Sequence, residues 1–116
     1  MNIQTTNKSL NKIIDELIIL FRKKEFNFLI EKAKEKIKEF PESFELYNLI
    51  GITFAEIKNI KQSIKYYKKA LIANPKNFIS DFYLGSLYHD NGDLLNALKH
   101  YKKSTNLNPK YSNAWF

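Results

Sequence analysis

The spacing of proline constrains this chain more than any other feature. It has three prolines, Pro41, Pro75 and Pro109, and each follows the one before it by 34 residues. Because proline lacks a backbone N–H and stops helices, an even proline spacing indicates helical segments that end at a fixed period. A period of this length is typical of stacked repeat proteins, in which each unit buries its apolar face against its neighbours.

Other residues follow the same period. Gly51 recurs as Gly85, and Phe54 recurs as the aromatic Tyr88. One unit contains, in order, Tyr47, Ile50, Gly51, Phe54, Ser63, Tyr67, Ala70 and Pro75. The next contains Leu84, Gly85, Tyr88, Ala97, Tyr101, Ser104 and Pro109, and it departs from the first at Asp81, where an aromatic residue is expected.

This order of an aromatic residue, Leu-Gly, Tyr, a small residue, a second aromatic and Pro resembles the pattern of tetratricopeptide repeat (TPR) proteins. The resemblance is specific because spacing and residue size agree at eight positions. It implies an all-α fold, a right-handed solenoid of antiparallel helix pairs with 34-residue repeats.

The apolar spacing predicts helices over residues 9–22, 26–39, 43–57, 60–73, 77–91 and 94–107. Four polar residues stand where helix N-caps are expected: Ser43, Asn59, Asn77 and Asp93. Gly51 and Gly85 fall inside helices, where glycine costs about 1 kcal/mol relative to alanine. We therefore expect a neighbouring helix to approach closely there, with Ala70 and Ala97 as the small residues opposite.

The period divides the chain into units. We expect a flexible N-terminus over residues 1–8, a degenerate first repeat over 9–41, and full repeats over 43–76 and 77–110. Leu17 replaces the glycine in the first unit, which suits an N-terminal cap. Residues 111–116 start a further, truncated repeat with Trp115 at its first aromatic position. This interpretation makes the chain the N-terminal piece of a longer protein.

The composition argues against catalysis within these residues. No cysteine is present, so disulfides, thiol catalysis and cysteine-ligated metals are excluded. The two histidines, His89 and His100, fall on different predicted helices, which argues against a two-histidine metal site, and no cofactor is expected. No signal peptide is visible, and the apolar stretch near residues 13–21 is too short to span a bilayer. A cytoplasmic, non-enzymatic chain is the default prediction.

The resemblance implies that the first helix of each repeat lines a concave groove that grips a partner peptide or helix. Matched residue by residue, the expected groove positions are Glu45, Asn48, Ile52, Ala55, Glu56, Ile79, Phe82, Ser86, His89 and Asp90. Ile52, Ile79 and Phe82 are the apolar residues expected to face solvent in part. The alternative is that they are ordinary surface, or that they touch a neighbouring repeat.

The net charge of +7 gathers in lysine columns. The predicted basic face comprises Lys61, Lys65, Lys68, Lys69, Lys99, Lys102 and Lys103. Such a face attracts phosphates, anionic lipid or an acidic protein, although compositional drift toward lysine also explains it. The patch has no arginine fork and no interleaved exposed aromatic residues, which disfavours nucleic acid.

Three functional hypotheses follow. The first is a protein–protein interaction module that binds a protein or peptide partner in the groove and has no catalysis of its own. The second is the N-terminal TPR arm of a larger enzyme, such as a glycosyltransferase or sulfotransferase. The third is self-association through an apolar C-terminal edge formed by Leu94, Leu98, Tyr101 and Trp115.

Overall fold

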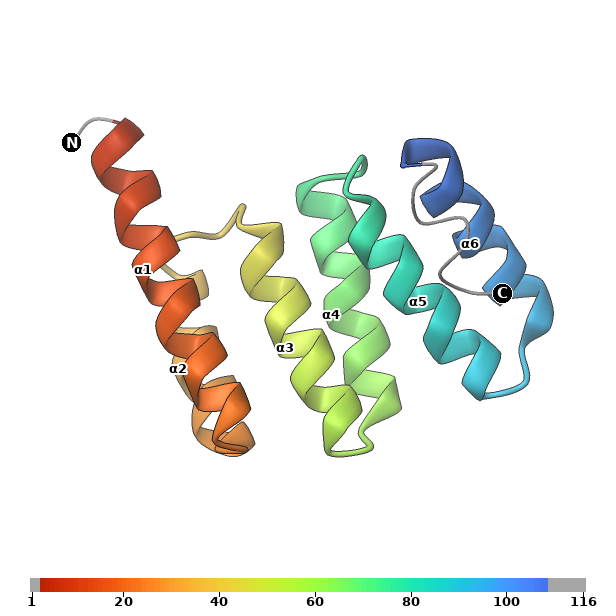
Figure 1. The fold of residues 1–116 in the computed structure, drawn as a ribbon, viewed down its shortest axis with the longest axis horizontal. Coiled ribbons are helices and arrows are strands. Elements are labelled where there is room, and N and C mark those ends of the chain that lie inside the picture. Colours follow the sequence, from red (N-terminus) through yellow and green to blue (C-terminus); the bar gives the residue numbers. More distant parts are fainter. Residues whose placement is uncertain (1–2, 109–116) are drawn as a thin grey trace.

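The computed structural model describes residues 3–108, and in that range all the regular structure is helical. The six helices are α1 (Ile3–Arg22), α2 (Phe26–Ile37), α3 (Phe44–Glu56), α4 (Ile60–Ala73), α5 (Phe78–Asp90) and α6 (Leu94–Leu107). They follow one another in chain order along the long axis of the molecule (Figure 1). The arrangement is an elongated α-solenoid with principal extents of 43 × 30 × 21 Å. The predicted fold class is confirmed.

The helix boundaries follow from local chemistry. α4 and α6 occupy the predicted residues, and each of the four predicted N-caps accepts a hydrogen bond from the backbone N–H three residues later. The Asn77 side chain, for example, accepts from the N–H of Ser80 at 2.9 Å. Each cap satisfies an otherwise unpaired N–H at a helix start and contributes about 1 kcal/mol.

The largest difference from the predicted helix boundaries lies at the start of α1, whereas the ends of α2, α3 and α5 differ by one or two residues. α1 begins at Ile3, whereas the predicted helix begins at residue 9. The intervening segment contains neither proline nor glycine, so nothing in it stops the helix from extending toward the N-terminus. The flexibility of residues 1–8 in solution stays a prediction. The predicted start of a further repeat at 111–116 lies outside the described residues.

The turns within the three helix pairs share a backbone feature that the sequence did not reveal. Lys24, Lys58 and Gly92 have φ of 61°, 66° and 81°, and they are spaced 34 residues apart. All three therefore end the first helix of a pair in the left-handed conformation, which suits glycine best. Only the last turn uses glycine, so two lysines accept a conformation that costs an L-residue about 1–2 kcal/mol.

The helices pack as pairs, and the pairs pack on one another. α3 packs against α4 and α5 against α6, while contacts of α2 with α3 and of α4 with α5 join successive pairs. Leu17, Leu29 and Ala33 from the first pair are fully buried in one cluster with Leu46 and Ile50 of α3. The first helix pair therefore shares its core with the next one, as expected of a repeat array.

The two helical glycines make room for tyrosine rings. A Cβ added to Gly51 would lie 2.9 Å from the ring of Tyr67, and one added to Gly85 would lie 2.6 Å from the ring of Tyr101. A neighbouring helix approaches closely at both glycines, as predicted, but the side chains nearest to them are not the predicted ones. The nearest atoms belong to tyrosine rings rather than to Ala70 or Ala97, because a planar ring lying flat on the helix backbone fills the space that a missing side chain leaves.

Candidate functional site

A small pocket opens between α3 and α5, the first helices of two successive repeats. Its volume is about 190 Å³, and it is lined by Ile52, Ala55, Glu56, Tyr67, Tyr83, Ser86 and Leu87. Four of these residues, Ile52, Ala55, Glu56 and Ser86, belong to the groove positions predicted from the sequence. The structure thus brings predicted residues from both repeats to one hollow, with aliphatic and aromatic walls and a single carboxylate at Glu56.

Two stacked tyrosines form one wall of this pocket. The rings of Tyr67 and Tyr83 have centroids 5.4 Å apart and an interplanar angle of 13°. Burial raises the pKa of Tyr67 above its ordinary value, and the neighbouring Tyr83 acts in the same direction. Tyr67 therefore keeps its proton at neutral pH. The stacked pair therefore offers the pocket a flat, uncharged aromatic wall.

The sequence did not place Tyr67, Tyr83 or Leu87 in the site. Tyr67 belongs to the repeat pattern and was not among the expected groove positions, and it is 2% exposed. The number of residues between Tyr67 and Tyr83 does not indicate a contact unless the packing of α4 on α5 is already known. The pocket is formed where helices of different repeats meet, and the spacing within one helix does not reveal it.

Asn48 occupies a different environment from that of a surface groove residue. It is buried, and its Oδ1 lies 2.6 Å from Oγ of Ser80 on α5. The same Ser80 Oγ lies 2.6 Å from Oδ1 of Asn77, the cap of α5. These contacts connect α3 to the start of α5, so Asn48 helps to fix the relative position of two repeats.

The remaining predicted groove residues are spread along α3 and α5. Glu45, Ile79 and Phe82 are half-buried, whereas His89 and Asp90 are exposed. Phe82 contacts the rings of Tyr83 and Tyr101, each with its centroid 5.9 Å away. Nδ1 of His89 lies 3.8 Å from Oδ1 of Asp90, which is too far for a hydrogen bond.

The predicted basic face divides into free and engaged lysines. Five are exposed and have no carboxylate partner within the described residues: Lys61, Lys65, Lys68, Lys99 and Lys102. The other two are held by neighbours. Nζ of Lys69 lies 4.9 Å above the ring of Tyr66, and Nζ of Lys103 lies 3.4 Å from Oδ2 of Asp81.

The C-terminal edge proposed for self-association is only partly exposed. Leu94 and Leu98 are exposed, but Tyr101 is buried and its hydroxyl donates to Oγ of Ser86 at 3.2 Å. The expectation of an exposed Tyr101 was wrong, because its ring packs against the backbone of Gly85. Trp115 lies outside the described residues. Self-association itself stays a prediction.

Among residues 3–108, no three histidine or acidic side chains gather in a way that could hold a metal ion. In the same range, no helix has the length and apolar character needed to cross a bilayer.

Comparison with known families settles the resemblance suggested by the repeats. A model of the tetratricopeptide repeat matches residues 44–77 and 83–111, which together make up more than half of the chain. The chain belongs to the tetratricopeptide repeat family. The two matched segments correspond to the helix pairs α3–α4 and α5–α6, the two units in which the sequence pattern is clearest.

This TPR chain is similar to a curated relative and to two solved structures. A TPR repeat-containing protein of Borreliella burgdorferi is 36% identical over 60 residues, which cover 48% of this chain and 26% of the relative. A MamA fragment from Desulfovibrio magneticus superposes with a TM-score of 0.76 at 17% identity, over 84% of this chain and 55% of that one. The chain thus spans about a quarter of the curated relative and about half of the MamA fragment.

The second structure is a type III secretion chaperone, SycD of Yersinia enterocolitica, solved with a peptide of the translocator YopD. It superposes with a TM-score of 0.82 at 10% identity, over 92% of this chain and 84% of that one. At these identities the two structures show that the fold is shared.

Proposed function

We propose that this TPR chain is a protein-interaction module that binds a partner peptide or helix on the surface formed by α3 and α5. The pocket between these helices is the observation that carries the proposal. It is open, its walls are aliphatic and aromatic, and its volume of about 190 Å³ suits one apolar side chain. The SycD structure, a fold relative solved with a bound peptide, supports a peptide as the class of partner.

The chemistry of the pocket describes the anchor that it would accept. Ile52 and the stacked Tyr67 and Tyr83 offer contact area to an aliphatic or aromatic side chain. Glu56 and Ser86 supply acceptors at the rim for backbone N–H groups of the ligand. Because Glu56 carries the only charge among the lining residues, the anchor is uncharged and a neighbouring basic residue is favoured.

The test is a selection of peptides from a random displayed library on the intact chain. Clones that bind the parent are then measured on a variant carrying Ile52→Ala and Phe82→Ala. We expect loss of binding of about tenfold or more, because one wall and one flank of the surface are removed. The free energy of unfolding of the variant should stay within about 1–2 kcal/mol of that of the parent, since both side chains are only half-buried.

Leu95→Ala provides the matched control. It removes an aliphatic side chain that is 84% exposed on α6 and lies outside the pocket. Selected peptides should bind this variant as they bind the parent. Peptides that bind the double variant unchanged would show that the surface of α3 and α5 is not the binding site.

A further inference from the structure

A second surface, on the outer side of α4, combines charge and an apolar hollow. Lys61, Lys65, Lys68 and Ile72 fall within a narrow arc of the helix, because residues along an α-helix advance by about 100° each. The buried residues Tyr67 and Ala70 lie elsewhere on the helix, packed into the core. α4 contains no acidic residue, so nothing on the helix itself neutralises this stripe.

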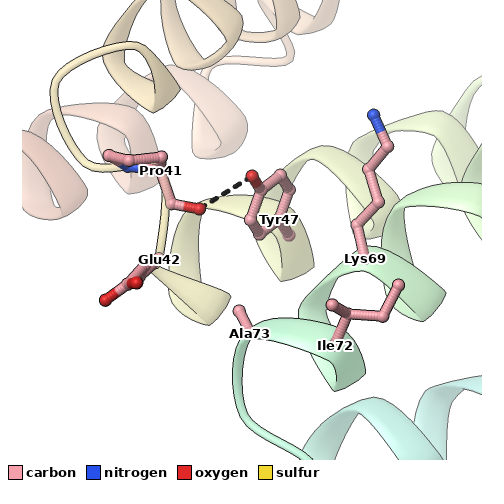
Figure 2. Close-up of a pocket in the computed structure, with 6 residues that line it drawn as sticks. All are labelled: Pro41, Glu42, Tyr47, Lys69, Ile72 and Ala73. Carbon is pink, nitrogen blue, oxygen red and sulfur yellow. Dashed lines mark hydrogen bonds between the residues drawn. The ribbon is translucent and has the colours of Figure 1, made fainter.

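A cleft lies at the C-terminal end of the stripe. It is lined by Pro41, Glu42, Tyr47, Lys69, Ile72 and Ala73, and its volume is about 440 Å³ (Figure 2). The hydroxyl of Tyr47 donates to the carbonyl oxygen of Pro41 at 2.9 Å, which fixes the loop before α3 against one side of the cleft. Ile72 is 81% exposed, an unusual state for an isoleucine next to a hollow of this size.

We propose that this surface binds an acidic peptide segment with an apolar residue at one of its ends. The acidic residues lie along Lys61, Lys65 and Lys68, and the apolar side chain enters the cleft beside Ile72. Charge complementarity selects the occupant, because these lysines have no carboxylate partner among residues 3–108. The surface is separate from the pocket between α3 and α5, so the proposal stands independently of the proposed function.

The geometry also sets the length of the segment and the end of α4 at which its acidic residues lie. From Lys61 to Ile72 the helix rises about 16 Å. An extended peptide covers that distance with about five residues. The positive end of the α4 dipole lies near Lys61, which favours the acidic residues there. Glu42 and Lys69 both line the cleft, so neither sign of charge is favoured and the residue that enters it is uncharged.

Other anionic ligands fit these observations less well. Apart from the cleft, the stripe offers no exposed aromatic side chain on which a nucleic-acid base could stack. A membrane surface calls for a continuous apolar helix face, whereas Ile72 is the only exposed apolar residue of α4.

The test uses the intact chain and two fluorescent pentapeptides, four glutamates followed by leucine and the reversed sequence, measured by anisotropy. We expect one of them to bind, and replacing its leucine with serine should weaken binding about tenfold, because the apolar contact is lost. Lys65→Glu with Lys68→Glu should weaken binding at least tenfold, since two attractions become repulsions. No binding by either peptide at about 1 mM would overturn the proposal.

The repeat supplies a matched control. Lys99 and Lys102 occupy the equivalent positions on α6, but the equivalent of Ile72 there is Asn106. Lys99→Glu with Lys102→Glu changes the net charge equally without touching the cleft, and it should weaken binding less than about threefold. All four substituted lysines are exposed, and circular dichroism would verify that both variants fold. Equal weakening by the two pairs would overturn the proposal, as would tighter binding to oligouridylate or to phosphatidylserine vesicles than to either peptide.

Discussion

The two best-defined repeats fill equivalent positions between their helices with different kinds of side chain. In the pair α3–α4, Tyr47 and Tyr66 face each other with ring centroids 6.4 Å apart, and Nζ of Lys69 lies 4.9 Å above the Tyr66 ring. Residues 34 positions later form the corresponding set in α5–α6. There Nδ1 of His100 lies 2.9 Å from Oδ1 of Asp81, and Lys103 lies 3.4 Å from Oδ2.

The surroundings of the two sets are alike. Tyr66 stacks on Phe54 at 5.7 Å, and His100 stacks on Tyr88 at 5.6 Å. The backbone frame therefore accepts either a pair of aromatic rings or a carboxylate hydrogen-bonded to an imidazole at one place. The two arrangements differ in how they respond to substitution. A smaller side chain in the aromatic pair removes part of the contact area, whereas loss of a partner of the fully buried Asp81 leaves a carboxylate unpaired, which is costly.

The largest expected effect breaks a feature that the repeats share. Gly51→Leu should lower the free energy of unfolding by about 3 kcal/mol or more, because even the first carbon of the new side chain overlaps the ring of Tyr67. Chemical denaturation followed by circular dichroism measures it. Combining it with Tyr67→Ala should cost less than the sum of the two single changes. Simple additivity would contradict the assigned contact.

The second prediction breaks the feature that separates the repeats. Asp81→Ala should destabilise the chain by about 2–3 kcal/mol, since it leaves His100 without its partner and opens a cavity. The value lies at the low end for buried pairs because Lys103 is half-exposed and screened by solvent. Asp81→Tyr with His100→Tyr, which copies the first repeat, should lie within about 1.5 kcal/mol of the parent. A harmless Asp81→Ala would show that the carboxylate does not hold α5 to α6.

The third prediction concerns pH and the tyrosine that borders both repeats. Burial raises the pKa of Tyr67 in the folded chain, so the folded state keeps this proton more tightly than the unfolded state does. The resulting stabilisation is complete below about pH 10, the ordinary value for tyrosine, and is lost above it at about 1.4 kcal/mol per pH unit. Subtracting the stability profile of Tyr67→Phe from that of the parent isolates this contribution. A flat difference above pH 10 would contradict it.

The smallest effect comes from the turns. Lys58→Gly gives the second pair the residue that the third pair has at Gly92, and it should stabilise the chain by about 0.5–1 kcal/mol. Glycine removes the strain of a left-handed L-residue in the folded state. Part of this gain is lost because glycine also gives the unfolded chain more conformational entropy. A thermal melt of Gly92→Lys should shift in the opposite direction. Shifts of the same sign in both variants would contradict the assigned turn conformation.

The fold could be predicted from the sequence more accurately than the candidate site. Proline spacing, apolar periodicity and the caps at Ser43 and Asn77 predicted the helices, because those signals act over a few residues. The groove prediction assigned Asn48 to a ligand-facing surface, whereas the structure buries it against Ser80, 32 residues away. Which side of a helix meets its neighbour is set by the packing of whole repeats, and one helix does not encode it.

The period, the number of helices over residues 9–107 and the N-caps at which α3, α4, α5 and α6 start could all be predicted from the amino-acid sequence. These depend on backbone geometry and hydrogen bonding within a turn or two of helix. Three other features depend on how the helices pack: Tyr67 fills the space at Gly51, Asp81 contacts His100, and Ile72 borders an open cleft. Each of these pairings depends on side-chain volume and charge meeting across different elements, and the interaction exists only after the helices have packed.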